Sequence, residues 1–239
     1  MKRDLVILGI CICVLCAISL IGAKKIVQTS AIQSVPRQAP VLILDAGHGG
    51  EDGGAVTAGG DKESGINLSI VLKLEQLMAF LGQDVILTRD TDCSIHSDDS
   101  ATLHEKKVSD LKNRVALVNS QNNAMLISIH QNYFTDPRYK GAQVFYGPGD
   151  IGRQWGEYTQ EVLKQLLDPN NHRAAKTIPD SIYLFSHVDC PALLVECGFL
   201  SNGEEASLLL TDNYQRKIAL ALAGSYLHQL QMMPNDREA

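Results

Sequence analysis

The chain has 239 residues, of which 45% are hydrophobic and 20% charged, and its net charge is −6. This composition is that of a globular protein with one sizeable core. Beyond residue 40 the chain holds 16 basic against 26 acidic residues, and aromatic residues make up only 5% of the whole. We therefore expect no binding to nucleic acid or to an anionic lipid surface, since both need basic patches and nucleic acid also favours stacking side chains.

The first 25 residues predict a membrane segment. An uncharged run extends from Leu5 to Ala23 and is flanked by basic pairs at Lys2-Arg3 and Lys24-Lys25. Its length matches the roughly 17–25 residues of a membrane span better than the roughly 7–15 of a cleaved signal. We predict a signal anchor over 1–25, with a cleaved signal as the alternative, then a linker over 26–40. A folded domain over 41–230 and a short tail over 231–239 follow, and we place the domain outside the cytoplasm.

Hydrophobic patterning in the folded domain alternates between strand and helix. Continuous apolar runs predict buried strands. The expected strands are 41–44, 85–88, 124–129, 142–146 (edge) and 193–195. Helical spacing predicts helices over 64–81, 108–118, 155–166 and 213–229. The polar stretch 90–107 is expected to be the least structured piece. The alternation predicts a single α/β domain with a largely parallel sheet and helices on both faces.

Four residues capable of metal or acid–base chemistry follow these strands or open a helix. His48 lies just beyond the first strand in Asp-Ala-Gly-His-Gly-Gly, His130 follows the third strand, and Glu196 follows the last. Carboxyl ends of parallel strands meet at one edge of a sheet. Glu63 opens the first helix after a glycine-rich loop that could return it to the same edge. Two imidazoles and one carboxylate form the ligand set of a hydrolytic zinc ion, and a second carboxylate remains to act as base.

These segments resemble the zinc-dependent N-acetylmuramoyl-L-alanine amidase family over residues 41–230. The likeness is most specific at the motif around His48, at Lys62-Glu63, at Ser-Ile-His130, and at Glu196-Cys-Gly-Phe-Leu-Ser-Asn. The resemblance implies that His48, Glu63 and His130 hold one Zn²⁺ per chain and that Glu196 is the catalytic glutamate. It also implies hydrolysis of the amide between N-acetylmuramic acid and L-alanine in peptidoglycan.

Within that family the chain looks most like the germination-specific amidases of spore-forming bacteria. The segments 140–146 and 183–188 carry this finer likeness. It implies processing of the spore cortex, a location in the forespore intermembrane or cortex space, and an accessory lipoprotein as activator. Asn132 and Arg89 are candidate substrate contacts. The family usually has small residues around the equivalent of Asn132, where this chain has Gln131 and Tyr133.

Each residue taken alone also has an ordinary structural interpretation. His48 could be a turn histidine, Glu63 an acid favoured by the helix dipole, and His130 a histidine satisfied at a strand end. Glu196 lies in an apolar run, where a charge needs a partner. All four together, in order and at one edge, favour a catalytic site.

Two other classes of protein stay open. One is an inactive peptidoglycan-binding or regulatory module of the same fold, which would have no use for a non-ligand carboxylate such as Glu196. The other is a zinc exopeptidase with two metal ions, for which Asp45 or Asp52 would have to supply a bridging carboxylate.

The remaining polar candidates have weaker assignments. We expect Arg114 to be structural, and His187 is a candidate to reach the site from the loop before the last strand. Other side chains are expected to be solvated: His96, His104, His172, His228, Asp98-Asp99 and Glu204-Glu205. Cys93, Cys190 and Cys197 read as small buried hydrophobes, with a Cys190–Cys197 bridge left open.

Overall fold

The computed structural model describes residues 39–233 and contains one six-stranded sheet in the order β2-β1-β3-β6-β4-β5. Its strands are β1 (Val41–Ala46), β2 (Val85–Leu87), β3 (Ala124–Asn132), β4 (Gln143–Tyr146), β5 (Lys176–Thr177) and β6 (Ala192–Phe199). β2, β1, β3 and β6 run parallel, whereas β4 is antiparallel to β6. The largely parallel sheet is thus confirmed. Two strands run against the other four: β4, which is the predicted edge strand, and the two-residue β5, which pairs with β4 in parallel and forms the outer edge.

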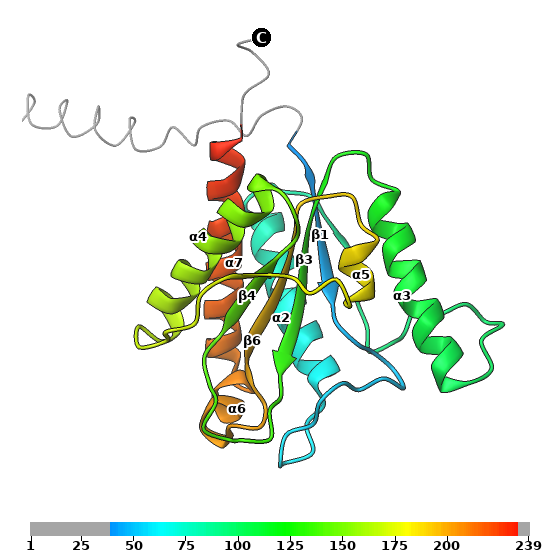
Figure 1. Ribbon diagram of the computed structural model, residues 1–239, viewed down its shortest axis with the longest axis horizontal. Helices are drawn as coiled ribbons and strands as arrows, with labels where there is room; N and C mark the ends of the chain where they lie inside the picture. The colour runs from blue at the N-terminus through cyan, green and yellow to red at the C-terminus, as the bar shows by residue number, and fades with distance from the viewer. Residues whose placement is uncertain (1–38, 234–239) are drawn as a thin grey trace, which may run out of the picture. The chain divides into compact units, whose positions relative to one another are not determined.

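Helices cover both faces of this sheet, as Figure 1 shows. They are α2 (Glu63–Phe80), α3 (Leu103–Asn119), α4 (Asp150–Leu167), α5 (Tyr183–Ser186), α6 (Gly203–Leu209) and α7 (Asp212–Met232). α2, α4 and α7 pack together on one face, and α3 and α5 lie on the other. The predicted membrane segment, most of the linker and residues 234–239 lie outside the described residues. Within 39–233, no helix combines the length and apolar character that a bilayer span requires.

The predicted apolar stripe of α7 lies in the core, whereas Tyr158 and Leu166 of α4 are exposed. In α7 the side chains of Tyr214, Ile218, Leu222 and Tyr226 are all buried at helical spacing. On the opposite face, Val118 of α3 and Leu184 of α5 pack with inward side chains of β1, β3 and β6. Burial on both faces explains why the central strands read as continuous apolar runs.

α3 begins inside the stretch 90–107, which we expected to be the least structured piece, and five residues before the predicted helix 108–118. Thr102 is its N-cap and accepts a hydrogen bond from the backbone N–H of Glu105, whose carboxylate accepts in turn from the Thr102 N–H. Such a capping box satisfies two otherwise unpaired donors and starts the helix. The Thr-x-x-Glu spacing was therefore a usable signal. The same spacing occurs at the start of α6, where the Asn202 side chain accepts a hydrogen bond from the Glu205 N–H at 2.9 Å. The short elements β5 and α5 have no comparable pattern.

The expectation that Glu204 and Glu205 are both exposed is wrong for Glu205. Its side chain is buried, and its two carboxylate oxygens accept the backbone N–H groups of Gly141 and Phe199 at 2.9 and 2.7 Å. Burial raises the pKa of Glu205. The Glu205 carboxylate thus links the loop before β4 to the end of β6. The contact with Gly141 joins residues distant in the chain, so the local sequence does not predict it. Cys190 and Cys197 are free thiols, so the bridge between them does not form.

Replacing Glu205 with alanine should destabilise the domain. Two backbone N–H groups would lose their acceptor, at about 1–3 kcal/mol for each buried unsatisfied group. We expect E205A to lower the free energy of unfolding in urea by about 2–4 kcal/mol, and the exposed neighbour E204A to change it by less than about 1 kcal/mol. Equal losses in the two variants would contradict the role assigned to Glu205.

Candidate active site

The four predicted residues converge at the carboxyl edge of the parallel strands. His48 lies two residues beyond β1, Glu63 is the first residue of α2, and His130 and Glu196 are paired directly across β3 and β6. Both β3 and β6 run further than predicted, so His130 and Glu196 lie inside the strands rather than after them. The pairing places both side chains on the same face of the sheet.

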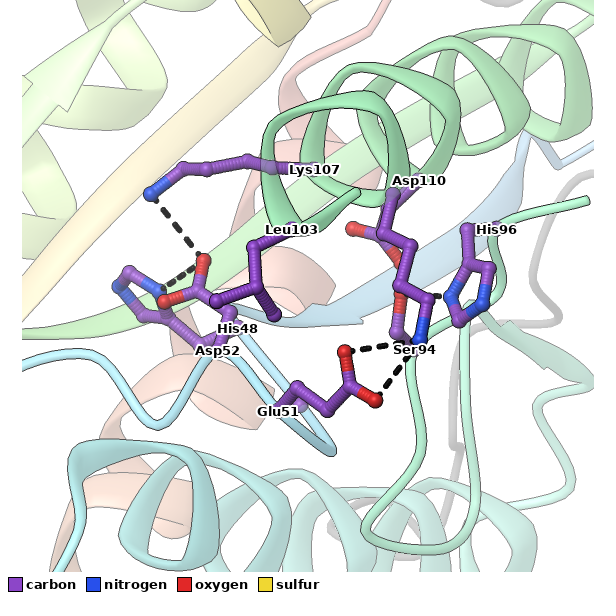
Figure 2. A pocket seen from close by; sticks show the side chains of 10 residues that line it. His48, Glu51, Asp52, Ser94, His96, Leu103, Lys107 and Asp110 are labelled. Atoms are coloured by element: carbon purple, nitrogen blue, oxygen red, sulfur yellow. Dashed lines mark hydrogen bonds and ion pairs between the residues drawn. The ribbon is translucent and has the colours of Figure 1, made fainter. Parts of the chain in front are cut away.

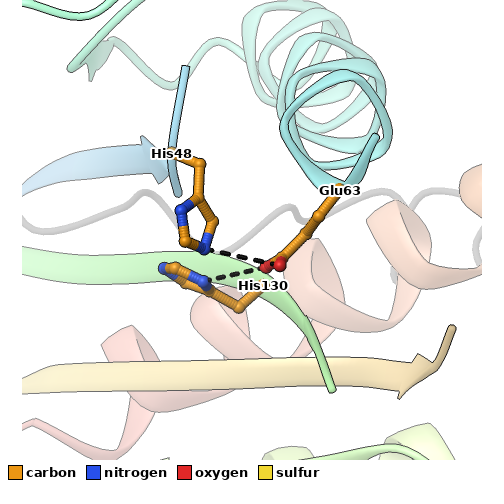
Figure 3. A group of neighbouring side chains, drawn as sticks. All are labelled: His48, Glu63 and His130. Atoms are coloured by element: carbon orange, nitrogen blue, oxygen red, sulfur yellow. Dashed lines mark hydrogen bonds and ion pairs between the residues drawn. The ribbon is translucent and has the colours of Figure 1, made fainter. Parts of the chain in front are cut away.

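The Glu63 carboxylate lies beside the two histidines and contacts both (Figure 3). Its Oε2 atom is 3.4 Å from His48 Nε2 and its Oε1 atom is 3.1 Å from His130 Nδ1. One nitrogen of each histidine and one oxygen of Glu63 all lie within 4.8 Å of one another. Among residues 39–233, this is the one group of three or more such side chains with metal-binding geometry.

The protein keeps Glu63 ionised. Burial alone would raise its pKa, but hydrogen bonds from His130 and His48 lower it far below the ordinary value. The backbone N–H groups of Ala55 and Gln131 also donate to its two oxygens, at 2.9 and 3.0 Å. A carboxylate with this many donors stays negative at neutral pH and is held in one orientation.

Glu196 has the opposite environment. Its Oε2 atom is buried and has no hydrogen-bond partner among residues 39–233. Burial raises the pKa of Glu196, and the negative charge of Glu63 adds to that shift while the neighbouring imidazoles oppose it. One carboxylate of the site is thus fully engaged, and the other has a free oxygen that can take a proton.

The loop that carries His48 has an unusual backbone. His48 has φ of 63°, a left-handed conformation that costs energy for a residue other than glycine. Gly47 passes so close under His130 that a Cβ atom there would lie 2.2 Å from the imidazole ring. This close approach requires glycine before His48 and explains the Ala-Gly-His sequence.

Two buried arginines hold this loop by its carbonyl groups. Arg114 donates to the carbonyl oxygens of Ala46 and His48 at 2.9 and 2.8 Å, and Arg89 donates to those of Ala46 and Gly47 at 2.9 and 3.1 Å. Arg114 also bonds the carboxylates of Asp45 and Asp110. The predicted structural role of Arg114 is confirmed. Arg89 is 3% exposed and lies behind the loop, so the structure gives it a positioning role in place of the expected substrate contact.

A small cavity of about 180 Å³ lies beside His48, between its loop and α3 (Figure 2). Asp52 forms part of its wall and lies 3.1 Å from both His48 Nδ1 and Lys107 Nζ. A carboxylate on the second ring nitrogen fixes the tautomer of a metal-binding histidine and leaves Nε2 available. From the sequence, Asp52 was a candidate only as a ligand for a second metal. Its position behind His48 depends on the turn between the two residues, which the sequence does not show.

The other candidates lie in varied positions. Asn132 ends β3 at the same edge as the site and is half-buried. His187 is exposed, stacks on Tyr183, and lies near the C-terminal end of α3, away from this edge. His96, which was expected to be solvated, is half-buried, lines the cavity beside His48 and bonds Ser94.

Comparison with known proteins shows the family of this chain. Residues 42–225 match the N-acetylmuramoyl-L-alanine amidase family. The germination-specific N-acetylmuramoyl-L-alanine amidase of Bacillus subtilis is 36% identical over 190 residues, or 79% of each chain. The structure of the CwlD amidase from Clostridioides difficile, in complex with the GerS lipoprotein, has a TM-score of 0.78 and 40% identity, covering 81% of this chain and 100% of that one. The amidase AmiC2 of Nostoc punctiforme has a TM-score of 0.65 and 27% identity, covering 80% and 97%. The chain belongs to the N-acetylmuramoyl-L-alanine amidase family.

The ion pair behind the loop should make stability depend on pH. Burial alone would raise the pKa of Asp45, but the Arg114 guanidinium and the Ser128 hydroxyl lower it from 3.8 to about 2. A carboxyl with a depressed pKa stabilises the fold above its unfolded pKa and loses that contribution as pH falls through the folded one. We expect about 2–3 kcal/mol of unfolding free energy to be lost between about pH 4 and pH 2.

Urea unfolding at steps across this range provides the measurement. D45N should be less stable than the wild type at pH 7 and should lack this part of the pH slope, whereas D98N, at an exposed position, should keep it. A D45N slope equal to that of the wild type would contradict the assignment.

Proposed function

We propose that this amidase is zinc-dependent and that it processes peptidoglycan of the spore cortex. The observation that carries the catalytic part is the pair of contrasting carboxylates, one in contact with two imidazoles and one with a free buried oxygen. The amidase family acts on the amide that joins N-acetylmuramic acid to L-alanine, so the site has a defined bond to cleave.

The donor set fits zinc. His48, Glu63 and His130 would hold one Zn²⁺ per chain, and three protein ligands with a further open position are typical of catalytic zinc sites. The bound ion would supply Lewis acidity, which polarises the scissile carbonyl and lowers the pKa of a neighbouring water. Asp52 holds the His48 ring through Nδ1, so Nε2 faces Glu63 without any rearrangement of the loop.

Glu196 would perform the proton transfers. Its unpartnered oxygen takes a proton from the attacking water and later delivers it to the nitrogen of the leaving L-alanine. A raised pKa suits both steps, because a stronger base takes the proton and the resulting acid still gives it to an amine. Asn132, at the same edge of the sheet, is proposed to contact the substrate beside the scissile bond.

The biological setting is proposed from the relatives. One is a germination-specific amidase, and another was solved as a complex with a lipoprotein. We propose that the chain works on the cortex, outside the cytoplasm, with a lipoprotein of the same kind as partner and with residues 1–25 as membrane anchor.

The two alternative classes have less support. An exopeptidase would need a second metal ligand set, yet Asp45 is bound to Arg114 and Asp52 to Lys107. Mass spectrometry of muropeptides from treated sacculi decides between the classes. Release of intact stem peptides from muramic acid supports the proposal; cuts within the peptide, or no product at all, would contradict it.

Each ligand variant should lose both zinc and activity. H48A, E63A and H130A each remove one of three protein ligands, so we expect well under one zinc per chain and no measurable muropeptide hydrolysis. Metal analysis by mass spectrometry and a hydrolysis assay on the same samples check this. H187A, whose imidazole lies away from the site, is the control and should keep both. A ligand variant with full zinc and normal turnover would remove that residue from the set.

E196Q should fold, keep zinc and lose most of its hydrolysis. The amide has the size of the carboxylate but cannot accept the proton of water, and general acid–base groups contribute about 10²–10⁴ in rate. Zinc content and kcat should be compared with those of the wild type at equal protein concentration. Normal turnover would exclude Glu196 from proton transfer, and loss of zinc would make it a metal ligand.

A further inference from the structure

A row of side chains continues across the sheet beyond Glu196. The register pairs His130 of β3 with Glu196 of β6, and Glu196 with Gln143 of β4. Directly paired residues have their side chains on the same face. Gln143 therefore lies beside the proposed catalytic carboxylate, one strand further from His130.

Arg173 extends this row outward. Its Nη1 atom donates to the Gln143 side-chain oxygen at 2.7 Å, and its Nε atom donates to the Lys140 carbonyl at 3.0 Å. The guanidinium carbon lies 4.5 Å from the centre of the Phe199 ring. These contacts hold a half-buried guanidinium in one orientation and leave its Nη2 atom without a hydrogen bond among the described residues.

An open hollow of about 580 Å³ borders this guanidinium. Tyr139 and Lys140 form part of its wall together with Arg173. Within residues 39–233, neither Lys140 nor Arg173 has a carboxylate oxygen within 4.0 Å. Two cations without a carboxylate in direct contact thus face one hollow, next to a half-exposed tyrosine, and Asp136, Arg138 and Asp168 complete its charged lining.

The acidic groups nearby are already engaged. Asp136 is 2.6 Å from Arg138, and Asp168 accepts the backbone N–H of Asn170 at 2.9 Å. Glu205 is close enough to influence Arg173, but both its oxygens accept backbone N–H groups. Three cations, Arg138, Lys140 and Arg173, and two carboxylates, Asp136 and Asp168, line the hollow, so its lining keeps a net positive charge that suits an external anion.

We propose that this hollow is a subsite for a carboxylate of the peptide that leaves with L-alanine. The inference rests on the proposed function, since it places the scissile amide at Glu196. Adjacent strands are about 4.8 Å apart and an extended peptide spans about 3.3 Å per residue. A carboxylate two or three residues beyond the scissile bond would thus reach Arg173. The planar guanidinium is suited to bind it, and Tyr139 packs against the peptide stem.

Kinetics on paired substrates test the subsite. One substrate is a disaccharide muropeptide with free stem carboxylates, and the other is the same muropeptide with those carboxylates amidated. On the free form, R173Q should raise KM roughly tenfold and leave kcat unchanged, which corresponds to the loss of one charge-assisted contact. K140Q should raise KM about two- to fivefold. On the amidated form, wild type and both variants should have the same KM.

Matched variants separate charge from structure. K217Q removes an exposed cation on α7 and should behave as the wild type on both substrates. R173K keeps the charge without the planar fork and should fall between wild type and R173Q. If R173Q raises KM equally on both substrates, its effect is structural and the subsite is wrong. If R173Q fails to fold, K140Q at its exposed position still decides the outcome.

A binding measurement that needs no turnover tests the subsite independently of the proposed function. Calorimetry with zinc-loaded E196Q and the free muropeptide should give a Kd about tenfold lower than that of the E196Q/R173Q double variant. Equal Kd values would overturn the subsite even if the wild type cleaves the muramoyl–alanine amide. Conversely, a wild type that leaves that amide intact contradicts the proposed function, while the ratio of Kd values still reports on the hollow.

Discussion

The buried guanidinium of Arg114 is the interaction on which the site depends. It joins α3 to the end of β1 through Asp45 and to the following loop through the carbonyls of Ala46 and His48. Burying an arginine is costly unless every donor finds an acceptor. Here the acceptors lie on β1, on α3 and on the His48 loop. The cost of burying the guanidinium is therefore offset only when all three elements are in place. The strained backbone at His48 is held as part of the same network.

Near this loop, the two glutamates of the site have the same chemistry but different surroundings, and the surroundings suit them to different roles. Glu63 accepts from two backbone N–H groups and lies against two imidazoles, which stabilises its charge. Glu196 is buried without a partner for one oxygen, which favours its neutral form. The first arrangement suits a metal ligand, and the second suits a group that exchanges a proton.

The antiparallel strand β4 explains how the site extends sideways. Because β4 runs against β6, its first residue, rather than its last, lies at the edge that holds Glu196. The loop that enters β4 therefore ends at the same edge and presents Tyr139 and Lys140 there. Glu205 ties this loop to β6 through Gly141 and Phe199, so the hollow beside Arg173 has a rigid border with the proposed catalytic row.

The sequence by itself determined the α/β class and the parallel central strands and indicated the four residues of the candidate site, because apolar runs and strand-end positions are local signals. It also indicated the family through motifs whose spacing does not depend on the packing. Tertiary structure alone decided the roles of Asp52, Arg89, Glu205 and Gln143, whose partners lie on other elements or across a turn. Glu205 was expected to be exposed and is buried in the structure. Arg89 was expected to contact the substrate and instead supports the His48 loop. The physical reason is that burial and hydrogen-bond partners come from residues distant in the chain, which composition and periodicity do not encode.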